Sequence, residues 1–221
     1  DLENIAALAE KHHIPLLIDA VAFIGKEPFT MPPGVSAVCL SGHKFHAPKG
    51  IGALIARSHF KLKPVFLGGA QELQKRAGTE NLPGILGLAE AVTILQSEQE
   101  AIAQTLLDLR CHLENQLLSR IPDVRINGEG PRIANTLCAA FLGVEGEALL
   151  MHLDMAGIAV SHGSACSSGS LEPSRVLTQM GIDRKTARSS IRISLSRLNT
   201  REEIDCFVDS IESIVTKLRQ R

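Results

Sequence analysis

The stretch VSAVCLSGHKFHAPKGIGALIAR, residues 35–57, carries the pattern that decides the fold. It opens with a short apolar run that ends abruptly in the polar sequence SGHK, and GIGALIAR (50–57) predicts a further strand. Upstream, residues 2–13 carry apolar side chains at helical spacing and lead into the apolar run IPLLIDA (14–20). Helix, short loop and buried strand in this order are typical of a parallel α/β sheet.

The second half of the chain follows a different pattern. A long helical stretch after residue 84 leads into RING, NTLCAAFLG and GIAVSHG, which predict strands. EGEALLMHLDMA and residues 200–219 predict helices, and SSIRISL alternates polar and apolar residues as a half-buried strand does. We therefore expect a first domain over residues 1–95 that is part of an α/β fold, and a smaller α+β domain over residues 96–221.

Composition and charge exclude several classes of function. The chain has 221 residues, 44% of them hydrophobic, and a net charge of −1 without any run of basic residues. Nucleic-acid binding needs clustered positive charge, so we expect no nucleic-acid partner. No apolar run approaches the roughly 20 residues of a membrane span, so we expect no membrane partner either. The chain starts at DLENIAALAE with no initiator methionine, and we expect it to be the later part of a longer protein.

The five cysteines do not form a disulfide or zinc pattern, because their number is odd and no CxxC occurs. This favours a cytoplasmic or similarly reducing compartment. Cys39 and Cys138 lie in apolar runs and are expected in the core, whereas Cys111 and Cys206 fall in helical patterns and are expected to pack. Cys166 alone lies among small and hydroxyl residues, in VSHGSACSSGSLEPS (160–174), and is predicted to be an exposed loop thiol.

Two strand ends carry reactive side chains. Lys44 directly follows an apolar strand, where partial desolvation is expected to lower its pKa and free its amine as a nucleophile. Asp19 ends the neighbouring strand. Ligands of open α/β sheets bind at the carboxyl ends of strands. A lysine that binds an aldehyde and an acid that pairs with a pyridinium nitrogen are what a protein contributes to a pyridoxal phosphate enzyme. Taken alone, Lys44 could equally be an ordinary surface lysine. Asp19 could equally be a carboxylate that caps a helix or a turn.

Four motifs resemble the cysteine desulfurases, which belong to the class V aminotransferase group with PLP-transferase fold type I. They are SGHKFHAPKGIGAL, RAGTENLPGILGLAEA, GSACSSGSLEPSRVL and SSIRISLSRLNTREEID, in the family's order over essentially the whole chain. The resemblance implies a C-terminal part of the large PLP-binding α/β domain in residues 1–95, and a smaller α+β domain with a catalytic cysteine loop in residues 96–221.

The resemblance also implies a role for each matching residue. Lys44 would bind pyridoxal 5′-phosphate covalently, and Asp19 would pair with its ring nitrogen. Ser41 and His43 would hydrogen-bond its phosphate, and Thr79 would reach the phosphate of the other subunit in a homodimer. The residues that would act on the substrate L-cysteine are Arg192, which would bind its carboxylate, and Cys166, which would take its sulfur as a persulfide.

The implied reaction converts L-cysteine to L-alanine and passes sulfur from Cys166 to an acceptor protein, such as an iron–sulfur scaffold. His162, close to Cys166, would either help to deprotonate the thiol or have no role. The other histidines show no pairing that suggests a metal, and we expect them to be solvated or hydrogen-bonded.

Two departures from the family pattern keep alternatives open. Ala22 stands where the family usually has a glutamine that contacts the cofactor, and the residues that precede this region in family members are absent. If the chain existed alone, we would expect poor cofactor retention and an exposed sheet edge. A selenocysteine lyase-like enzyme, or an inactive desulfurase-like module that binds a sulfur-acceptor protein, therefore remain the alternatives.

Overall fold

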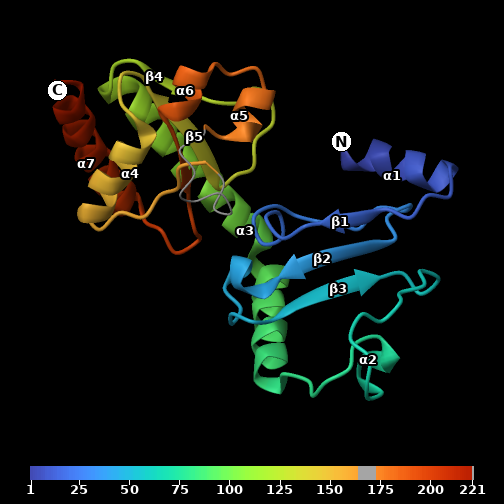
Figure 1. Ribbon diagram of the computed structural model, residues 1–221. Helices are drawn as coiled ribbons and strands as arrows, with labels where there is room; N and C mark the ends of the chain where they lie inside the picture. The colour runs from blue at the N-terminus through green and yellow to red at the C-terminus, as the bar shows by residue number, and fades with distance from the viewer. Residues whose placement is uncertain (164–172, 221) are drawn as a thin grey trace. The chain divides into compact units, whose positions relative to one another are not determined.

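The computed structural model describes residues 1–163 and 173–220, and it divides into two compact units (Figure 1). The N-terminal unit comprises Asp1–Ala101 and the C-terminal unit Ile102–Arg221. Helix α3 (Leu82–Arg120) is one continuous helix of 39 residues, and it contains both the division at 101/102 and the predicted domain boundary at 95/96.

The N-terminal unit contains a three-stranded sheet in the order β1 (Leu17–Asp19), β2 (Ala37–Ser41) and β3 (Gly52–Ala56) (Figure 1). Strands β1 and β2 are parallel, as the pattern predicts, whereas β3 pairs with β2 in the antiparallel direction. The expectation of a wholly parallel sheet is therefore wrong at β3. The link from β2 to β3 is too short for the crossover that a parallel neighbour requires, which takes about a dozen residues or more.

Helix α1 (Leu2–Lys11) buries Ala6 and Ala9, and Ala6 forms a core cluster with Ala20, Val35 and Val38. Gly34 allows this close approach, because a Cβ at this position would lie 2.2 Å from the main-chain oxygen of Ala6. Its φ of +82° also lies in the left-handed region that glycine adopts without strain. The core of the N-terminal unit is therefore small and depends on close backbone contact.

Large apolar side chains remain exposed on the described part of the N-terminal unit. They include Ile5 and Leu8 on α1, Leu17 on β1, and Leu54 and Ile55 on β3. A short helix α2 (Gln71–Gln74) follows in the loop between β3 and α3. Burying such side chains contributes about 1.5–3 kcal/mol each, so this unit leaves substantial hydrophobic stabilisation unused.

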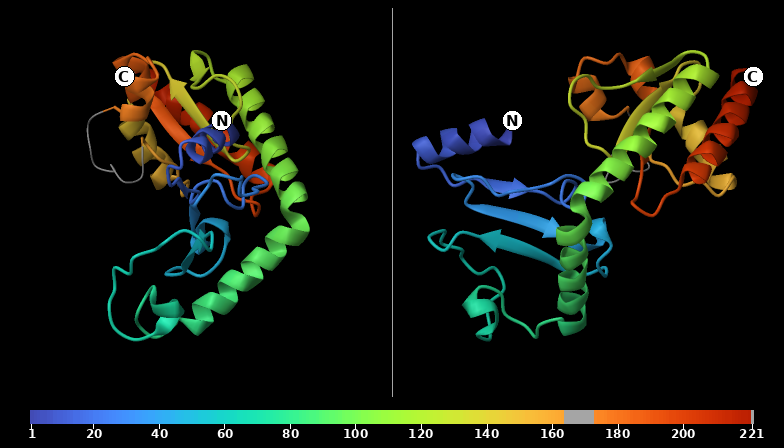
Figure 2. Two further views of the ribbon diagram at one scale, coloured as in Figure 1. Left: turned by 90° about the vertical axis from the view of Figure 1, so that its right-hand side faces the viewer. Right: turned by 180° about the vertical axis from the view of Figure 1, so that it is seen from behind.

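The C-terminal unit is built on the antiparallel sheet β4 (Val124–Ile126), β5 (Thr136–Phe141) and β6 (Ser190–Ser194), with β5 in the centre (Figure 2). Its helices are α4 (Gly146–Met155), α5 (Arg175–Gln179), α6 (Arg184–Arg188) and α7 (Arg201–Arg219). The strand predicted in GIAVSHG is reduced to one bridge between Ser161 and Arg192. Helices α4 and α7 lie side by side, and α4, α7 and the sheet bury Leu149, Ile211 and Phe141.

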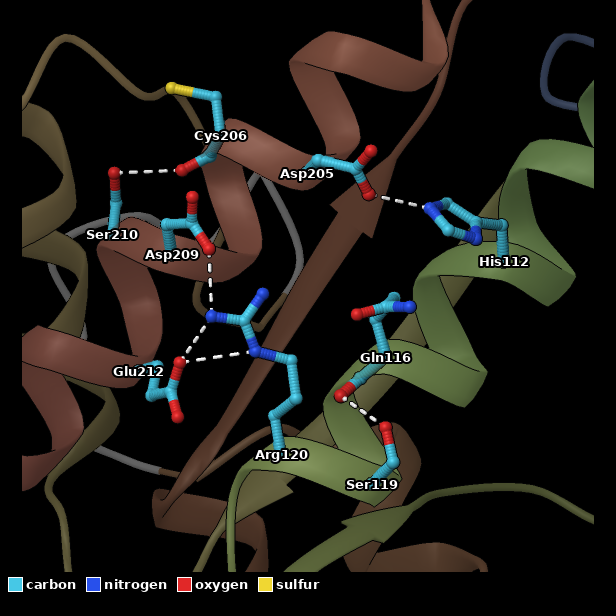
Figure 3. Close-up of polar contacts among 9 residues, drawn as sticks. All are labelled: His112, Gln116, Ser119, Arg120, Asp205, Cys206, Asp209, Ser210 and Glu212. Atoms are coloured by element: carbon cyan, nitrogen blue, oxygen red, sulfur yellow. Dashed lines mark hydrogen bonds and ion pairs between the residues drawn. The ribbon is translucent and has the colours of Figure 1, made fainter.

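Polar contacts join α3 to α7 within the C-terminal unit (Figure 3). Arg120 on α3 pairs with Asp209, at 2.7 Å, and with Glu212 on α7. His112 Nε2 lies 2.6 Å from Asp205, while Arg201 donates to His112 Nδ1 at 3.2 Å. Because Nδ1 accepts, Nε2 carries the hydrogen and donates to the carboxylate. His112 is thus a structural residue, as expected for a histidine without metal partners.

Four cysteines fall within the described residues, and two of them differ from expectation. Cys39 and Cys138 are half-buried in strands, but Cys111 and Cys206 are exposed on helices α3 and α7. The expectation that these two pack is wrong, because helical periodicity alone does not tell which face of a helix meets a neighbour.

Within the described part of the chain, every helix is too short or too polar to cross a membrane.

Candidate active site

The carboxyl ends of β1 and β2 meet at one end of the N-terminal sheet. In the parallel register Asp19 lies opposite Cys39, so Asp19 and Ser41, with the residues that follow it, are at the same end. The Asp19 carboxylate accepts from the main-chain amide of Val21 at 3.0 Å, which orients it at the start of the next turn. The predicted juxtaposition of the two strand ends is therefore present in the structure.

Lys44 lies in a 3₁₀-helix, η1 (Gly42–Phe45), that begins immediately after β2. Gly42 is buried, and a Cβ there would lie 2.9 Å from Ala47 Cβ and 3.1 Å from Ile51 O, so the tight turn requires glycine. Ser41 Oγ and His43 Nδ1 lie 3.1 Å apart and form a hydrogen-bonded pair. A hydroxyl, an imidazole and a primary amine are thus presented together at the strand end.

The expected desolvation of Lys44 is not found, since its side chain and that of Asp19 are exposed in this chain. The half-buried lysine is Lys26, in the turn after β1, which the sequence analysis did not single out. Its Nζ donates to the main-chain oxygen of Lys44 at 2.7 Å. Burial, followed by repulsion from Lys44, lowers the pKa of Lys26 below its ordinary value. A basic residue seven positions after a strand-end acid is too common a pattern to identify it.

These side chains fit pyridoxal 5′-phosphate by their chemistry. The cofactor offers an aldehyde, a ring nitrogen and a dianionic phosphate. Lys44 supplies an exposed amine, Asp19 an exposed carboxylate, and Ser41 and His43 supply hydrogen-bonding groups at the same end of the sheet. Ala22 is exposed in the turn after Asp19, and its methyl group offers no hydrogen bond to a ligand. Thr79 lies exposed in the loop before α3, and its role toward another subunit stays a prediction.

The C-terminal unit contains a cavity of about 250 Å³ beside Arg192. Its lining includes Asn127, Cys138, Leu177, Met180 and Ser190. Arg192 Nη2 donates to Ser161 Oγ at a long 3.4 Å, and its Nε is buried and has no hydrogen-bond partner among the described residues. A buried guanidinium nitrogen without a partner is costly, and a bound carboxylate would satisfy it. Buried guanidinium nitrogens without a partner among the described residues also occur in Arg110, Arg132 and Arg219, so binding of a substrate carboxylate by Arg192 stays a prediction.

Cys138 lies directly opposite Arg192 on the neighbouring strand. Burial raises the pKa of the Cys138 thiol, while a hydrogen bond from Asn127 and the positive charge of Arg192 act in the opposite direction. Asn127 Nδ2 lies 3.4 Å from Cys138 Sγ and 2.9 Å from Ser190 Oγ. This thiol stays protonated at neutral pH, because desolvation is the largest of these effects.

We expect Cys138 to react with iodoacetamide at least about tenfold more slowly than Cys111 and Cys206 at pH 7.5, because only the thiolate is nucleophilic. Peptide mapping by mass spectrometry over a time course measures the three rates in one sample. Because the folded pKa of Cys138 is raised, its rate should continue to increase with pH above the ordinary pKa of a free cysteine. Equal rates at all three positions would contradict the burial of Cys138.

Cys166 lies outside the described residues, so its placement is not part of the structure. His162, two residues before that gap, has Nε2 3.2 Å from the main-chain oxygen of Arg188. A carbonyl oxygen only accepts, so Nε2 carries the hydrogen in this contact. The ring lies against Gly146, where a Cβ would be 2.6 Å from His162 Cδ2. His162 therefore has a structural contact, and a part in deprotonating Cys166 stays a prediction.

No group of three or more histidine, cysteine or acidic side chains within residues 1–163 and 173–220 is arranged to hold a metal ion. The candidate site residues are Asp19, Ser41, His43 and Lys44 in the N-terminal unit, and Arg192 with its cavity in the C-terminal unit. An α/β unit with an exposed lysine after a parallel strand, in a chain that also contains an α+β unit, agrees with the organisation expected of fold type I pyridoxal phosphate enzymes.

Comparison with known proteins identifies the family. Residues 1–207 match the family "Aminotransferase class-V", and the chain belongs to this family, whose members depend on pyridoxal 5′-phosphate. It is 43% identical over 220 residues to the "Cysteine desulfurase IscS" of Methanosarcina thermophila and, at the same level, to the "Cysteine desulfurase" of Trichormus azollae. These matches cover 99% of the chain but 54% and 55% of the two relatives.

Solved structures agree with the fold. A "NifS-like protein" superposes with a TM-score of 0.87 at 35% identity, over 97% of this chain and 56% of that one. The NifS-like protein from Rickettsia africae superposes with a TM-score of 0.86 at 32% identity, over 96% of this chain and 56% of its own. The predicted fold, part of PLP-transferase fold type I, is thereby confirmed. The chain spans about half the length of the curated relatives it matches.

Proposed function

We propose that the protein to which this chain belongs is a cysteine desulfurase that converts L-cysteine to L-alanine and leaves a persulfide on Cys166. The observation that carries the proposal is the meeting of Asp19, Ser41, His43 and Lys44 at one sheet end, in a chain that is 43% identical to proteins named cysteine desulfurase. The whole protein would use pyridoxal 5′-phosphate, held by these residues, with Thr79 contributing to a second subunit of a homodimer.

Each side chain has a defined task in this reaction. Lys44 would hold the cofactor covalently, and its amine would act as the base for the Cα proton of the substrate. Asp19 holds a proton on the ring nitrogen, and Ser41 and His43 bind the phosphate. When bound, pyridoxal 5′-phosphate supplies the electron sink that makes loss of the Cα proton possible. Arg192 orients the substrate by its carboxylate.

The sulfur atom passes from the thiol of L-cysteine to the thiol of Cys166. The Cys166 thiolate attacks the substrate sulfur, so an S–S bond forms and the Cβ–S bond breaks. The electron pair of that bond and a proton complete the methyl group of alanine. The remaining persulfide carries one added sulfur atom to an acceptor. We propose a protein acceptor such as an iron–sulfur scaffold, in a cytoplasmic or similarly reducing compartment, where Cys166 would be kept as a free thiol before it takes up sulfur.

The test uses the full-length protein that contains this chain, loaded with pyridoxal 5′-phosphate. L-Cysteine is added, alanine is quantified, and intact mass spectrometry measures the addition of one sulfur atom, which peptide mapping then locates. We expect alanine release and a persulfide on Cys166. Cys166→Ala should lose both, and Cys111→Ala, which removes an exposed thiol, should lose neither.

Other outcomes separate the alternatives. A strong preference for L-selenocysteine over L-cysteine, without a stable adduct on Cys166, would indicate a selenocysteine lyase-like enzyme. If a protein that is folded and loaded with cofactor yields neither alanine nor a persulfide, the result would indicate an inactive module that binds a sulfur-acceptor protein.

A further inference from the structure

The turn that follows β1 is packed directly on the 3₁₀-helix η1. Gly25 has a φ of +81°, and a Cβ at this position would lie 2.4 Å from Phe45 Cβ, so the backbone of Gly25 lies close against the Phe45 side chain. Phe45 is buried. At the other end of the turn, Gln99 Nε2 donates to the main-chain oxygen of Glu27 at 2.5 Å. The turn is therefore held on both sides, against η1 and against α3.

Lys26 lies in the middle of this turn and satisfies the backbone of η1. The last carbonyls of a helix lack donors within the helix. In η1 the amides of His46 and Ala47 both return to Gly42 O, whereas the oxygen of Lys44 accepts from Lys26 Nζ at 2.7 Å. A hydrogen bond from a charged ammonium group contributes more to stability than one between neutral groups. A positive charge is also favourable at the carboxyl end of a helix.

The side chain of Lys26 is more buried than those of nearby lysines, which distinguishes it as the donor in this contact. A lysine side chain is usually extended into water, and withdrawing its ammonium group from solvent has a free-energy cost. Lys26 is half-buried although neighbouring lysines such as Lys49 are exposed. Repulsion from Lys44 adds to the lowering of its pKa, so the two amines are close enough to interact. The contact persists because the gain at the Lys44 carbonyl offsets this cost.

We propose that Lys26 is a positioning residue for Lys44: it fixes the main chain of the cofactor-binding lysine by donating to its carbonyl oxygen, and so aims the Lys44 side chain at the end of β1. The part of this inference that concerns the cofactor rests on the proposed function. The part that concerns the main chain does not, since it depends only on the contacts of Lys26, Gly25 and Phe45.

The test compares Lys26→Met, Lys26→Arg and, as a matched control, Lys49→Met in the full-length protein without cofactor. Amide hydrogen exchange is followed on the peptide that covers residues 42–47. We expect exchange in Lys26→Met to be about tenfold faster than in the parent, because one charge-assisted hydrogen bond is lost. Lys26→Arg should recover most of the protection, and Lys49→Met should exchange like the parent.

A second readout concerns Lys44 itself. Each protein is mixed with pyridoxal 5′-phosphate and reduced with borohydride, and mass spectrometry measures the fraction captured on Lys44. We expect capture in Lys26→Met to fall about tenfold, with recovery in Lys26→Arg. Unchanged exchange and unchanged capture in Lys26→Met would overturn the proposal, as would equal losses in Lys49→Met. Because exchange is measured without cofactor or substrate, absence of desulfurase activity in the parent protein would refute the proposed function without deciding this point.

Discussion

Replacing Lys44 with alanine is expected to lower the rate of alanine release from L-cysteine by about 1,000-fold or more. The change removes both a covalent attachment and a base, and each step of this kind typically contributes orders of magnitude to a rate. Lys44 is exposed, and its side chain is not needed for the fold of η1, which depends on Gly42 and Phe45. We therefore expect the thermal unfolding midpoint of Lys44→Ala to match that of the parent.

The measurement is steady-state alanine release by the full-length protein at saturating pyridoxal 5′-phosphate, and the unfolding midpoint is taken on the same proteins without cofactor, because bound cofactor would stabilise the parent more than the variant. Lys49→Ala, which removes another exposed lysine of the same loop, should keep the parent rate within about twofold. A Lys44→Ala protein that is folded and loses less than tenfold in rate would show that another amine binds the cofactor, and Lys26 would be the first to examine.

Replacing Arg192 with glutamine is expected to raise the KM for L-cysteine about 100-fold while kcat changes by a few-fold at most. Removing one partner of a buried, hydrogen-bonded charge pair costs about 2–5 kcal/mol, which corresponds to this range. The adjacent cavity of about 250 Å³ would give a small carboxylate access to the guanidinium, whose buried Nε has no partner among the described residues. Glutamine retains a donor but neither the charge nor the bidentate geometry.

A substrate without a carboxylate makes this test specific. With L-cysteine methyl ester, the parent and Arg192→Gln should have similar KM values, because the interaction that is removed is absent from both. Arg125→Gln, an exposed arginine on β4, is the matched control and should leave the KM for L-cysteine unchanged. An equal rise in KM for acid and ester would indicate that Arg192 shapes the cavity instead of binding the carboxylate.

Much of the local structure could be predicted because its signals are local. The apolar runs before Asp19 and Ser41 form strands, and the periodic segment after Thr200 forms α7, where Thr200 and Glu203 form a capping box. The prediction of a strand over residues 157–163 is wrong, although the neighbouring strand β6 lies at the edge of its sheet. There the chain makes only the bridge of Ser161 to Arg192.

The order of residues by itself determined which reactive groups this protein has and that Asp19 and Lys44 follow strands, since strand ends are marked by the change from apolar to polar residues. Tertiary structure alone decided the antiparallel direction of β3 and which cysteines are exposed. It also revealed the partnership of Lys26 with Lys44, residues 18 positions apart. The physical reason is that strand direction, burial and hydrogen-bond partners depend on elements distant in sequence, whereas periodicity and turn chemistry report only on neighbours along the chain.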